Sequence, residues 1–152
     1  MKRLILFAAM VALTLTTTAQ ETADATMEKR AREMHRVIGV DDKEQWKTFM
    51  RENYTQALID KPMKIVVDTS DGSSGSSGAQ TIDKLDAKAA MYQRLHEDFG
   101  KGKLTSVKTT DGKVEMVVRN DDGVRATFIL TFAKTKPYLI DGIGIEVQDE
   151  GQ

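Results

Sequence analysis

The part of the chain that decides the fold is residues 91–147, which read MYQRLHEDFGKGKLTSVKTTDGKVEMVVRNDDGVRATFILTFAKTKPYLIDGIGIEV. Two turn dipeptides, Asp111-Gly112 and Asp122-Gly123, separate segments in which apolar and polar residues alternate. An Asp-Gly pair between alternating segments is among the strongest short-range signals for a β-hairpin. We therefore expect an antiparallel sheet whose strands span 103–109, 113–120, 124–134 and 138–148.

The alternation in the third of these strands assigns one apolar and one polar face to the sheet. Its apolar positions are Val124, Ala126, Phe128, Leu130 and Phe132. The polar positions between them are Arg125, Thr127 and Thr131, and Ile129 interrupts this polar series. The pattern is typical of a sheet with one face on the core and the other toward solvent or a partner. Ile129 indicates that part of the second face is covered too.

Helical spacing of apolar residues predicts three helices before the strands. They run from Thr26 to Ile38, from Asp41 or Asp42 to Lys61, and from Thr81 to Phe99. Gly39, Pro62 and Gly100 are their stop signals. Helices followed by a run of strands predict an α+β fold, with the N-terminal helices packed on one face of the sheet.

The first residues resemble a secretory signal peptide. Lys2 and Arg3 precede an apolar run from Leu4 to about Thr16, and small residues lead up to Ala19. The apolar run is shorter than the roughly 20 residues of a spanning helix, which argues against a membrane anchor. We expect residues 1–19 to be removed. The mature chain, 20–152, is then expected to be a single exported domain, periplasmic or extracellular, without a stable membrane span.

A glycine- and serine-rich segment lies between the expected second and third helices. Residues 69–80 read TSDGSSGSSGAQ, a composition typical of a flexible loop, and we interpret them in this way. A domain boundary and an engineered linker are the alternatives. The short run before it, Met63–Asp68, fits either a strand or an extended connector.

Composition argues against several classes of partner. The 22 basic and 23 acidic residues give a net charge of −1, whereas nucleic-acid binding favours a basic surplus. Cysteine is absent, and the two histidines, His35 and His96, lie far apart in the chain. Metal sites need several clustered donors. No nucleic acid, metal or cofactor is therefore expected.

Two stretches resemble a known family: Tyr92–Gly100, YQRLHEDFG, and Ile140–Ile145, IDGIGI. Together with the strands between them, they are similar to the cystatin-like domain of nuclear transport factor type that accompanies bacterial secreted serine hydrolases of the beta-lactamase class. The resemblance covers roughly residues 43–147, apart from the glycine- and serine-rich segment. It implies a cone of helices against a curved sheet, enclosing an apolar pocket. The Ser-x-x-Lys motif of those hydrolases is not in this chain.

Asp141 is the first candidate for acid–base chemistry, since some enzymes of this fold type use a carboxylate inside the cone. Strict alternation along the last strand places Asp141 on one face with Leu139, Ile143 and Ile145. A carboxylate among aliphatic side chains is the setting of a general base. A bulge at Gly142 that turns Asp141 to water is the alternative.

The other candidates have equally plain alternatives. His96, next to Glu97 and Asp98, is either an acid–base group or part of a solvated helix end. The aromatic residues could line a pocket or form ordinary core; they are Trp46, Tyr54, Tyr92 and Phe128. Charged residues on the polar sheet face mark either a partner surface or solvated cross-strand pairs; they are Glu115, Arg119 and Arg125.

Without a nucleophile, metal or cofactor motif, the sequence predicts an exported, noncatalytic binding or interaction domain. It would hold a small apolar ligand or a protein partner. The alternative is a small cone-fold enzyme that uses Asp141 or His96 on an apolar substrate.

Overall fold

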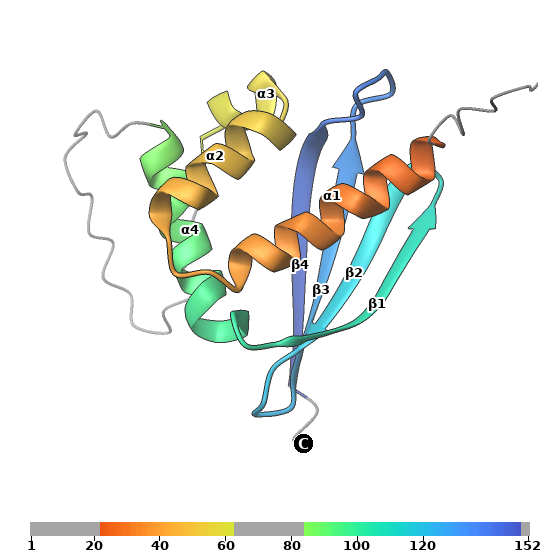
Figure 1. The fold of residues 1–152 in the computed structure, drawn as a ribbon. Helices are drawn as coiled ribbons and strands as arrows, with labels where there is room; N and C mark the ends of the chain where they lie inside the picture. Colours follow the sequence, from red (N-terminus) through yellow and green to blue (C-terminus); the bar gives the residue numbers. More distant parts are fainter. Residues whose placement is uncertain (1–21, 63–83, 150–152) are drawn as a thin grey trace, which may run out of the picture.

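The computed structural model describes residues 22–62 and 84–149, which form an α+β fold with four helices followed by four strands (Figure 1). The helices are α1 (Ala23–Ile38), α2 (Lys43–Asn53), α3 (Gln56–Asp60) and α4 (Lys84–Phe99). The strands are β1 (Lys103–Thr110), β2 (Lys113–Arg119), β3 (Val124–Phe132) and β4 (Ile140–Asp149). The predicted α+β class is confirmed. The expected signal peptide (1–19), the run 63–68 and the expected loop at 69–80 lie outside the described residues.

The four strands form an open antiparallel sheet in the order β1-β2-β3-β4. The first predicted hairpin turn lies at Asp111-Gly112, where Thr110 pairs with Lys113 and both turn residues have positive φ (50° and 73°). The predicted inward face is confirmed as well. Its most buried members are Val114, Met116, Val118, Ala126, Phe128 and Leu130. The hairpin signals and the alternation therefore determine both the pairing and the faces of the sheet.

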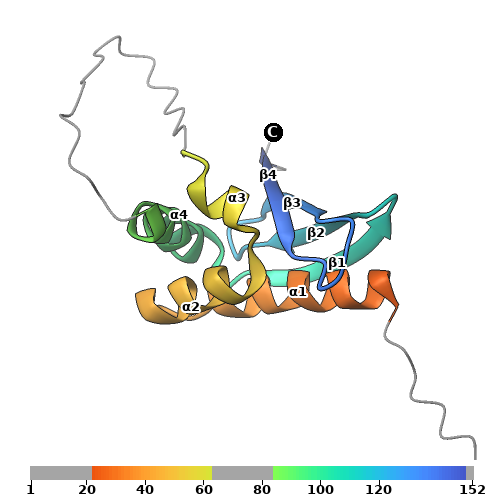
Figure 2. The ribbon, with the colours of Figure 1, turned by 90° about the horizontal axis from the view of Figure 1, so that it is seen from above.

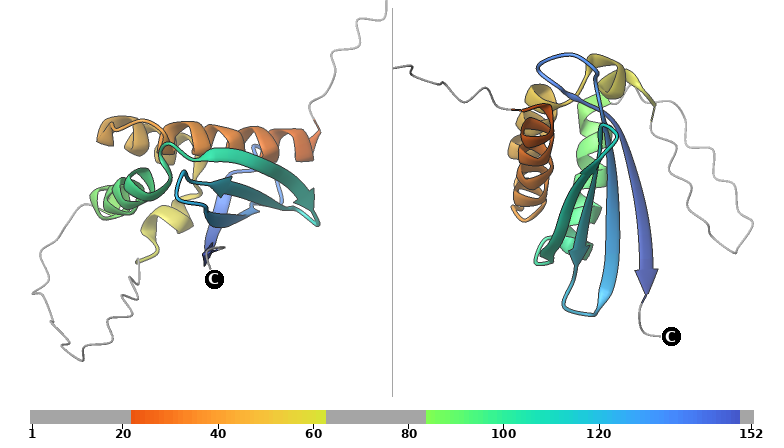
Figure 3. Two further views of the ribbon diagram at one scale, coloured as in Figure 1. Left: turned by 90° about the horizontal axis from the view of Figure 1, so that it is seen from below. Right: turned by 90° about the vertical axis from the view of Figure 1, so that its right-hand side faces the viewer.

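The helices lie on one face of the twisted sheet and leave the opposite face uncovered by helices (Figure 3, right). Helix α1 packs along β1 and β2, while α2 and α4 pack on each other beside it (Figures 1 and 2). Helix α3 lies between α4 and β4 (Figure 2). No helix in residues 22–62 and 84–149 is long and apolar enough to cross a membrane.

The second predicted helix is broken, so the expectation of one helix reaching Lys61 is wrong. Helix α2 ends at Asn53, Tyr54 is extended (φ −99°, ψ 148°), and Thr55 caps the separate helix α3. Tyr54 forms a parallel bridge with Ile140, and the amide of Thr55 donates to the carbonyl of Ile140 at 2.9 Å. The amide of Tyr54 still donates to the carbonyl of Met50 at 3.0 Å, whereas pairing with Ile140 gives the amide of Thr55 a partner in place of a helical one.

The last strand begins two residues later than predicted and carries a bulge near its start. Phe132 pairs with Ile140 and Thr131 pairs with Gly142, so Asp141 has no partner in the register. The extra residue reverses the alternation: Ile140 is fully buried, whereas Asp141 is exposed. The predicted strict alternation is therefore wrong at this end of β4, and the bulge alternative is correct.

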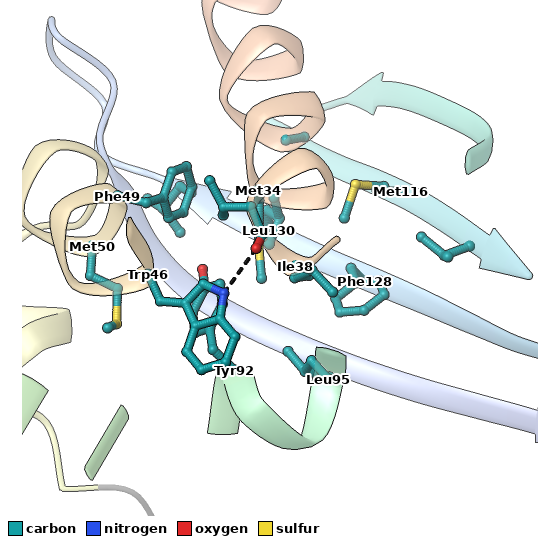
Figure 4. Packing of buried hydrophobic residues seen from close by; sticks show 14 of the residues in the cluster. Met34, Ile38, Trp46, Phe49, Met50, Tyr92, Leu95, Met116, Phe128 and Leu130 are labelled. Atoms are coloured by element: carbon teal, nitrogen blue, oxygen red, sulfur yellow. Dashed lines mark hydrogen bonds between the residues drawn. The ribbon is translucent and has the colours of Figure 1, made fainter. Parts of the chain in front are cut away.

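Side chains fill the space between the helices and the sheet (Figure 4). Phe99 of α4 meets Phe128 of β3 edge to face, with ring centroids 6.4 Å apart. The indole of Trp46 stacks on Tyr92 and donates to the carbonyls of Val37 and Val40 at 2.9 and 2.8 Å. The indole hydrogen bonds tie α2 to the end of α1, the stacking joins α2 to α4, and the Phe99–Phe128 contact joins α4 to β3. The four aromatic residues expected as pocket candidates are thus mainly core, each at most 3% exposed.

Candidate functional site

A small hollow opens at the edge of the core where α3, α4 and β4 meet, and its volume is about 240 Å³. We call it the α3–α4–β4 pocket. Its lining residues are Tyr54, Leu58, Lys61, Pro62, Lys88, Met91, Gly142 and Ile143. Apolar side chains from three elements form most of the wall. Of the four aromatic candidates, Tyr54 is the one that lines this hollow.

Lys88 is the most unusual residue of this wall, because it is a lysine that is only 5% exposed. It lies on the buried side of α4, together with Ala89 and Tyr92. Its ammonium group donates to the backbone carbonyl of Lys61 at 2.9 Å. Burial lowers the pKa of Lys88, the charge of Lys61 lowers it further, and Asp60 opposes the change. A buried ammonium group of this kind is costly unless it has acceptors.

Behind the pocket, two tyrosine hydroxyl groups meet. The hydroxyl of Tyr54 lies 2.6 Å from that of Tyr92, and both residues are buried. Burial raises the pKa of Tyr54 and of Tyr92, so both phenols are protonated at neutral pH. One hydroxyl donates to the other. The pair can therefore supply a neutral hydrogen-bonding group, but it is not a base near neutrality.

These groups suit the binding of a molecule that is both apolar and rich in acceptors. An ammonium group has three donors, and the bond to Lys61 uses one of them. A carboxylate or carbonyl oxygen placed against Lys88 would accept a charge-assisted hydrogen bond. The apolar wall from Leu58, Met91 and Ile143 would bury the rest of the ligand.

Asp141 does not enter this pocket or the core. Its side chain is exposed, and it accepts a 2.7 Å hydrogen bond from the hydroxyl of Thr55. Thr55 is at the same time the N-cap of α3, since its hydroxyl accepts from the amide of Leu58 at 3.1 Å. Asp141 thus links the bulge of β4 to the start of α3. The interpretation of Asp141 as an interior base is wrong.

The two histidines link the C-terminal parts of α1 and α4 to backbone carbonyls outside their own helices. The Nδ1 atom of His96 lies 2.8 Å from the carbonyl of Ile38, and the Nε2 atom of His35 lies 3.0 Å from that of Gly102. The ring of His96 also packs near Trp46, with centroids 6.1 Å apart. Its neighbours Glu97 and Asp98 are exposed. His96 therefore holds the end of α4 against the end of α1.

The described residues contain no group of three or more histidine, aspartate or glutamate side chains arranged to hold a metal ion. Glu115, Arg119 and Arg125 all lie on the face of the sheet that points away from the helices, where they line a separate shallow hollow with Thr105, Ser106, Lys108 and Val117. The structure therefore places the sequence candidates in four locations: the core, the end of α4, the bulge of β4 and the outer side of the sheet.

Comparison with protein-family models, curated proteins and solved structures gave no match. The assignment of a site therefore depends on the geometry of this chain alone.

The sequence reasoning missed Lys88, although a signal for it exists. The apolar residues of the predicted helix fall on one stripe, at Leu85, Ala89, Tyr92, Leu95 and Phe99. A strict alternation of three- and four-residue steps from Leu85 to Phe99 passes through Lys88 in place of Ala89. A lysine on the core stripe of an amphipathic helix was the available indication of a buried charge.

Proposed function

We propose that this chain is an exported, noncatalytic binding domain of cystatin-like type that holds an apolar group bearing a carboxylate in the α3–α4–β4 pocket. The observation that carries the proposal is the buried ammonium group of Lys88 in a mainly apolar wall. The expected leader sequence and the family resemblance support the exported, cystatin-like part of the proposal.

The size of the hollow limits what it can take. Small-molecule sites in proteins commonly measure about 300–1,000 Å³, and an engineered apolar cavity of about 150 Å³ holds benzene. A pocket of about 240 Å³ lies between these. It suits one ring or a short alkyl chain, either from a free carboxylic acid or from the C-terminal residue of a partner peptide.

The enzyme alternative depends on Asp141 or His96 lying in a pocket where it can reach a substrate. Asp141 is exposed and bonded to Thr55, and His96 is bonded to a backbone carbonyl at the far end of α4. Neither residue lines the pocket that contains Lys88. Binding without chemistry is therefore the function that the described residues support best.

The test is a titration of the isotope-labelled protein with three matched compounds, followed by amide NMR. They are 3-phenylpropionate, 3-phenylpropan-1-ol and 3-phenylpropylammonium, which share one apolar group and differ in the polar end. We expect 3-phenylpropionate to shift the signals of Leu58, Met91 and Ile143 and to bind most tightly. Lys88→Met should weaken it by about tenfold or more, since it removes a charge-assisted hydrogen bond.

The control is Lys101→Met, which removes an exposed lysine beyond the end of α4. It should leave the affinity for 3-phenylpropionate unchanged. Equal binding of the acid and the alcohol, together with no effect of Lys88→Met, would contradict a role for the ammonium group. No shift at millimolar concentration of any of the three compounds would contradict the pocket itself.

A further inference from the structure

The side of the sheet that faces away from the helices carries a strong excess of positive charge. We call this side, which the helices leave uncovered (Figure 3, right), the outer face. The strand register and the alternation of burial assign its side chains on β1 to β4. Among the described residues, its charged members are Lys103, Lys108, Lys113, Arg119, Arg125, Glu115 and Glu146. Five basic residues thus stand against two acidic ones. The whole chain has a net charge of −1, so this face differs in sign from the rest of the molecule.

Three of these cations lie in one row across three strands. Lys103 of β1 pairs with Arg119 of β2, and Arg119 pairs in turn with Arg125 of β3. Side chains directly opposite each other in a sheet have Cβ atoms about 4.5–5.5 Å apart, and like charges in such pairs are destabilising. The register thus gathers three cationic side chains at one end of the outer face, while farther along β1 and β2 Lys108 stands opposite Glu115.

Polar groups that suit an anion surround this row. Arg119 and Arg125 line a shallow hollow of about 390 Å³ together with Lys108 and the hydroxyl-bearing residues Thr105 and Ser106. Guanidinium groups bind carboxylates through two parallel hydrogen bonds, and hydroxyls can donate to the same oxygens. Three cations and two hydroxyls thus give the hollow the chemistry of an oxyanion site, although the carboxylate of Glu115 lines it too.

An apolar centre lies next to the cations. Val117 and Ile129 occupy diagonal positions on β2 and β3, and both are partly buried. On the flank of Ile129 stands Gly144, where an added Cβ would lie 3.7 Å from the Cβ of Ile129. Because Gly144 has no side chain, this flank of Ile129 is left open on β4. A small apolar centre with arginines around it is the composition of a protein-binding surface.

We propose that the outer face binds a protein surface on which aspartate or glutamate side chains surround a small apolar group.

Other classes of partner fit this face less well. The outward positions of the four described strands carry no aromatic side chain. Single-stranded nucleic acids are held by base stacking on aromatic side chains. Peripheral membrane segments use large apolar side chains. A second copy docked symmetrically would bring two rows of cations together. Acidic protein groups therefore fit this face best.

The first test uses the peptide acetyl-Glu-Glu-Leu-Glu-Glu-amide and amide NMR at low ionic strength. The signals of Thr105, Val117 and Thr127 should shift, and the affinity should fall as salt is added. The double variant Arg119→Gln/Arg125→Gln should bind about tenfold more weakly or worse, since it removes both guanidinium groups. The matched control, Arg51→Gln/Arg94→Gln, removes two exposed arginines from α2 and α4 and should keep the wild-type affinity.

The second test examines the apolar centre. Ile129→Thr makes this position resemble its outward neighbours Thr127 and Thr131, so the strand is expected to keep its pairing. It should weaken binding of the leucine peptide and leave unchanged the affinity for a peptide with serine in place of leucine. The dispersion of the NMR spectrum verifies that each variant is folded.

Three results would overturn the proposal. The first is an absence of shifts on the outer face at millimolar peptide, and the second is an equal loss of affinity in the Arg51/Arg94 control. The third is binding of heparin fragments or phosphatidylglycerol vesicles to this face in the absence of peptide binding. None of these results bears on the α3–α4–β4 pocket, whose ligand and residues are different.

Discussion

The hydroxyl of Tyr54 lies 2.6 Å from the hydroxyl of Tyr92, although 38 residues separate the two in the chain. Tyr54 sits at the break between α2 and α3, and Tyr92 lies in the middle of α4. Both side chains are buried, so the pair joins the broken helix to α4 inside the core. The same pair forms the back of the α3–α4–β4 pocket through Tyr54.

Removing both hydroxyls of this pair should cost less than the sum of the costs of removing each one alone. In Tyr54→Phe, the buried hydroxyl of Tyr92 loses its partner, and an unsatisfied buried hydroxyl costs about 1–3 kcal/mol. The double variant Tyr54→Phe/Tyr92→Phe leaves no such group, so its loss of stability should be smaller than the sum of the two single losses. Urea unfolding of the four proteins measures this. Additive losses would show that the two hydroxyls do not depend on each other.

Sequence patterns were sufficient for the sheet because its determinants are local. The turn at Asp111-Gly112 and the alternation from Val124 to Phe132 appear in the structure with the predicted faces. The cap of α2 was equally local: Asp42 accepts from the amides of Glu44 and Gln45. In each of these cases, neighbouring residues contain all the partners on which the conformation depends.

The misplaced features depend instead on partners far along the chain. Tyr54 and Thr55 have ordinary helix-compatible neighbours, and their extended backbone is explained by pairing with Ile140. The exposure of Asp141 depends in the same way on a bulge set by the register of β3 and β4. Lys88 was missed because a lysine in a helix is normally assigned to the solvent side. Tertiary contacts decided the first two features, whereas the position of Lys88 follows from the helical spacing of α4.

Thr55 and Asp141 should differ in their importance for stability, although they share a hydrogen bond. Thr55→Ala removes the N-cap of α3 and the bond to Asp141, which should cost about 0.5–2 kcal/mol. Thr55→Ser should retain most of the stability, because a serine hydroxyl can make both bonds. Asp141→Asn keeps an oxygen acceptor at the surface and should change the stability by at most about 0.5 kcal/mol. Chemical denaturation of the three variants ranks them, and a large loss in Asp141→Asn would contradict the surface role of this carboxylate.

Protonation of the Asp86 carboxylate should lower the stability of the fold in acid. Its carboxylate lies 2.6 Å from the ammonium of Lys47 and 2.9 Å from that of Lys43. Hydrogen bonds from these two lysines lower the pKa of Asp86 below its ordinary value of 3.8. A lowered carboxylate pKa stabilises the fold above the unfolded pKa, and this contribution is lost as pH falls through the folded pKa.

Replacing Asp86 by asparagine should therefore lower the melting temperature at pH values well above 3.8, and the difference from wild type should narrow as the pH falls below that value. The control is Asp98→Asn, an exposed carboxylate at the end of α4. It should show a smaller difference than Asp86→Asn at pH values well above 3.8. A gap that stays constant through the acid range would show that Asp86 acts through packing and not through its charge.

Lys88 should oppose folding at neutral pH, because its burial lowers its pKa from the ordinary value of 10.5. Between the folded and the unfolded pKa, the unfolded chain binds more protons at this site than the folded chain, so the wild type gains stability as pH rises through that interval. Methionine has a similar length and carries no charge to bury, and Lys61 is an exposed residue, so we expect its carbonyl to bond to water in the variant. Lys88→Met should therefore be more stable than wild type at pH 7, and its advantage should shrink as pH rises toward and past 10.5.

Melting curves of both proteins from neutral to alkaline pH test this. Tyr54 and Tyr92, whose pKa values are raised by burial, also lower the stability above pH 10, but they do so in both proteins and cancel in the difference. Lys88→Met should thus be more stable and yet bind 3-phenylpropionate more weakly. Higher stability combined with weaker binding is expected of a variant that removes a charge held in an apolar wall for a ligand. A variant that is less stable at every pH would instead identify Lys88 as a structural link between α4 and the end of α3.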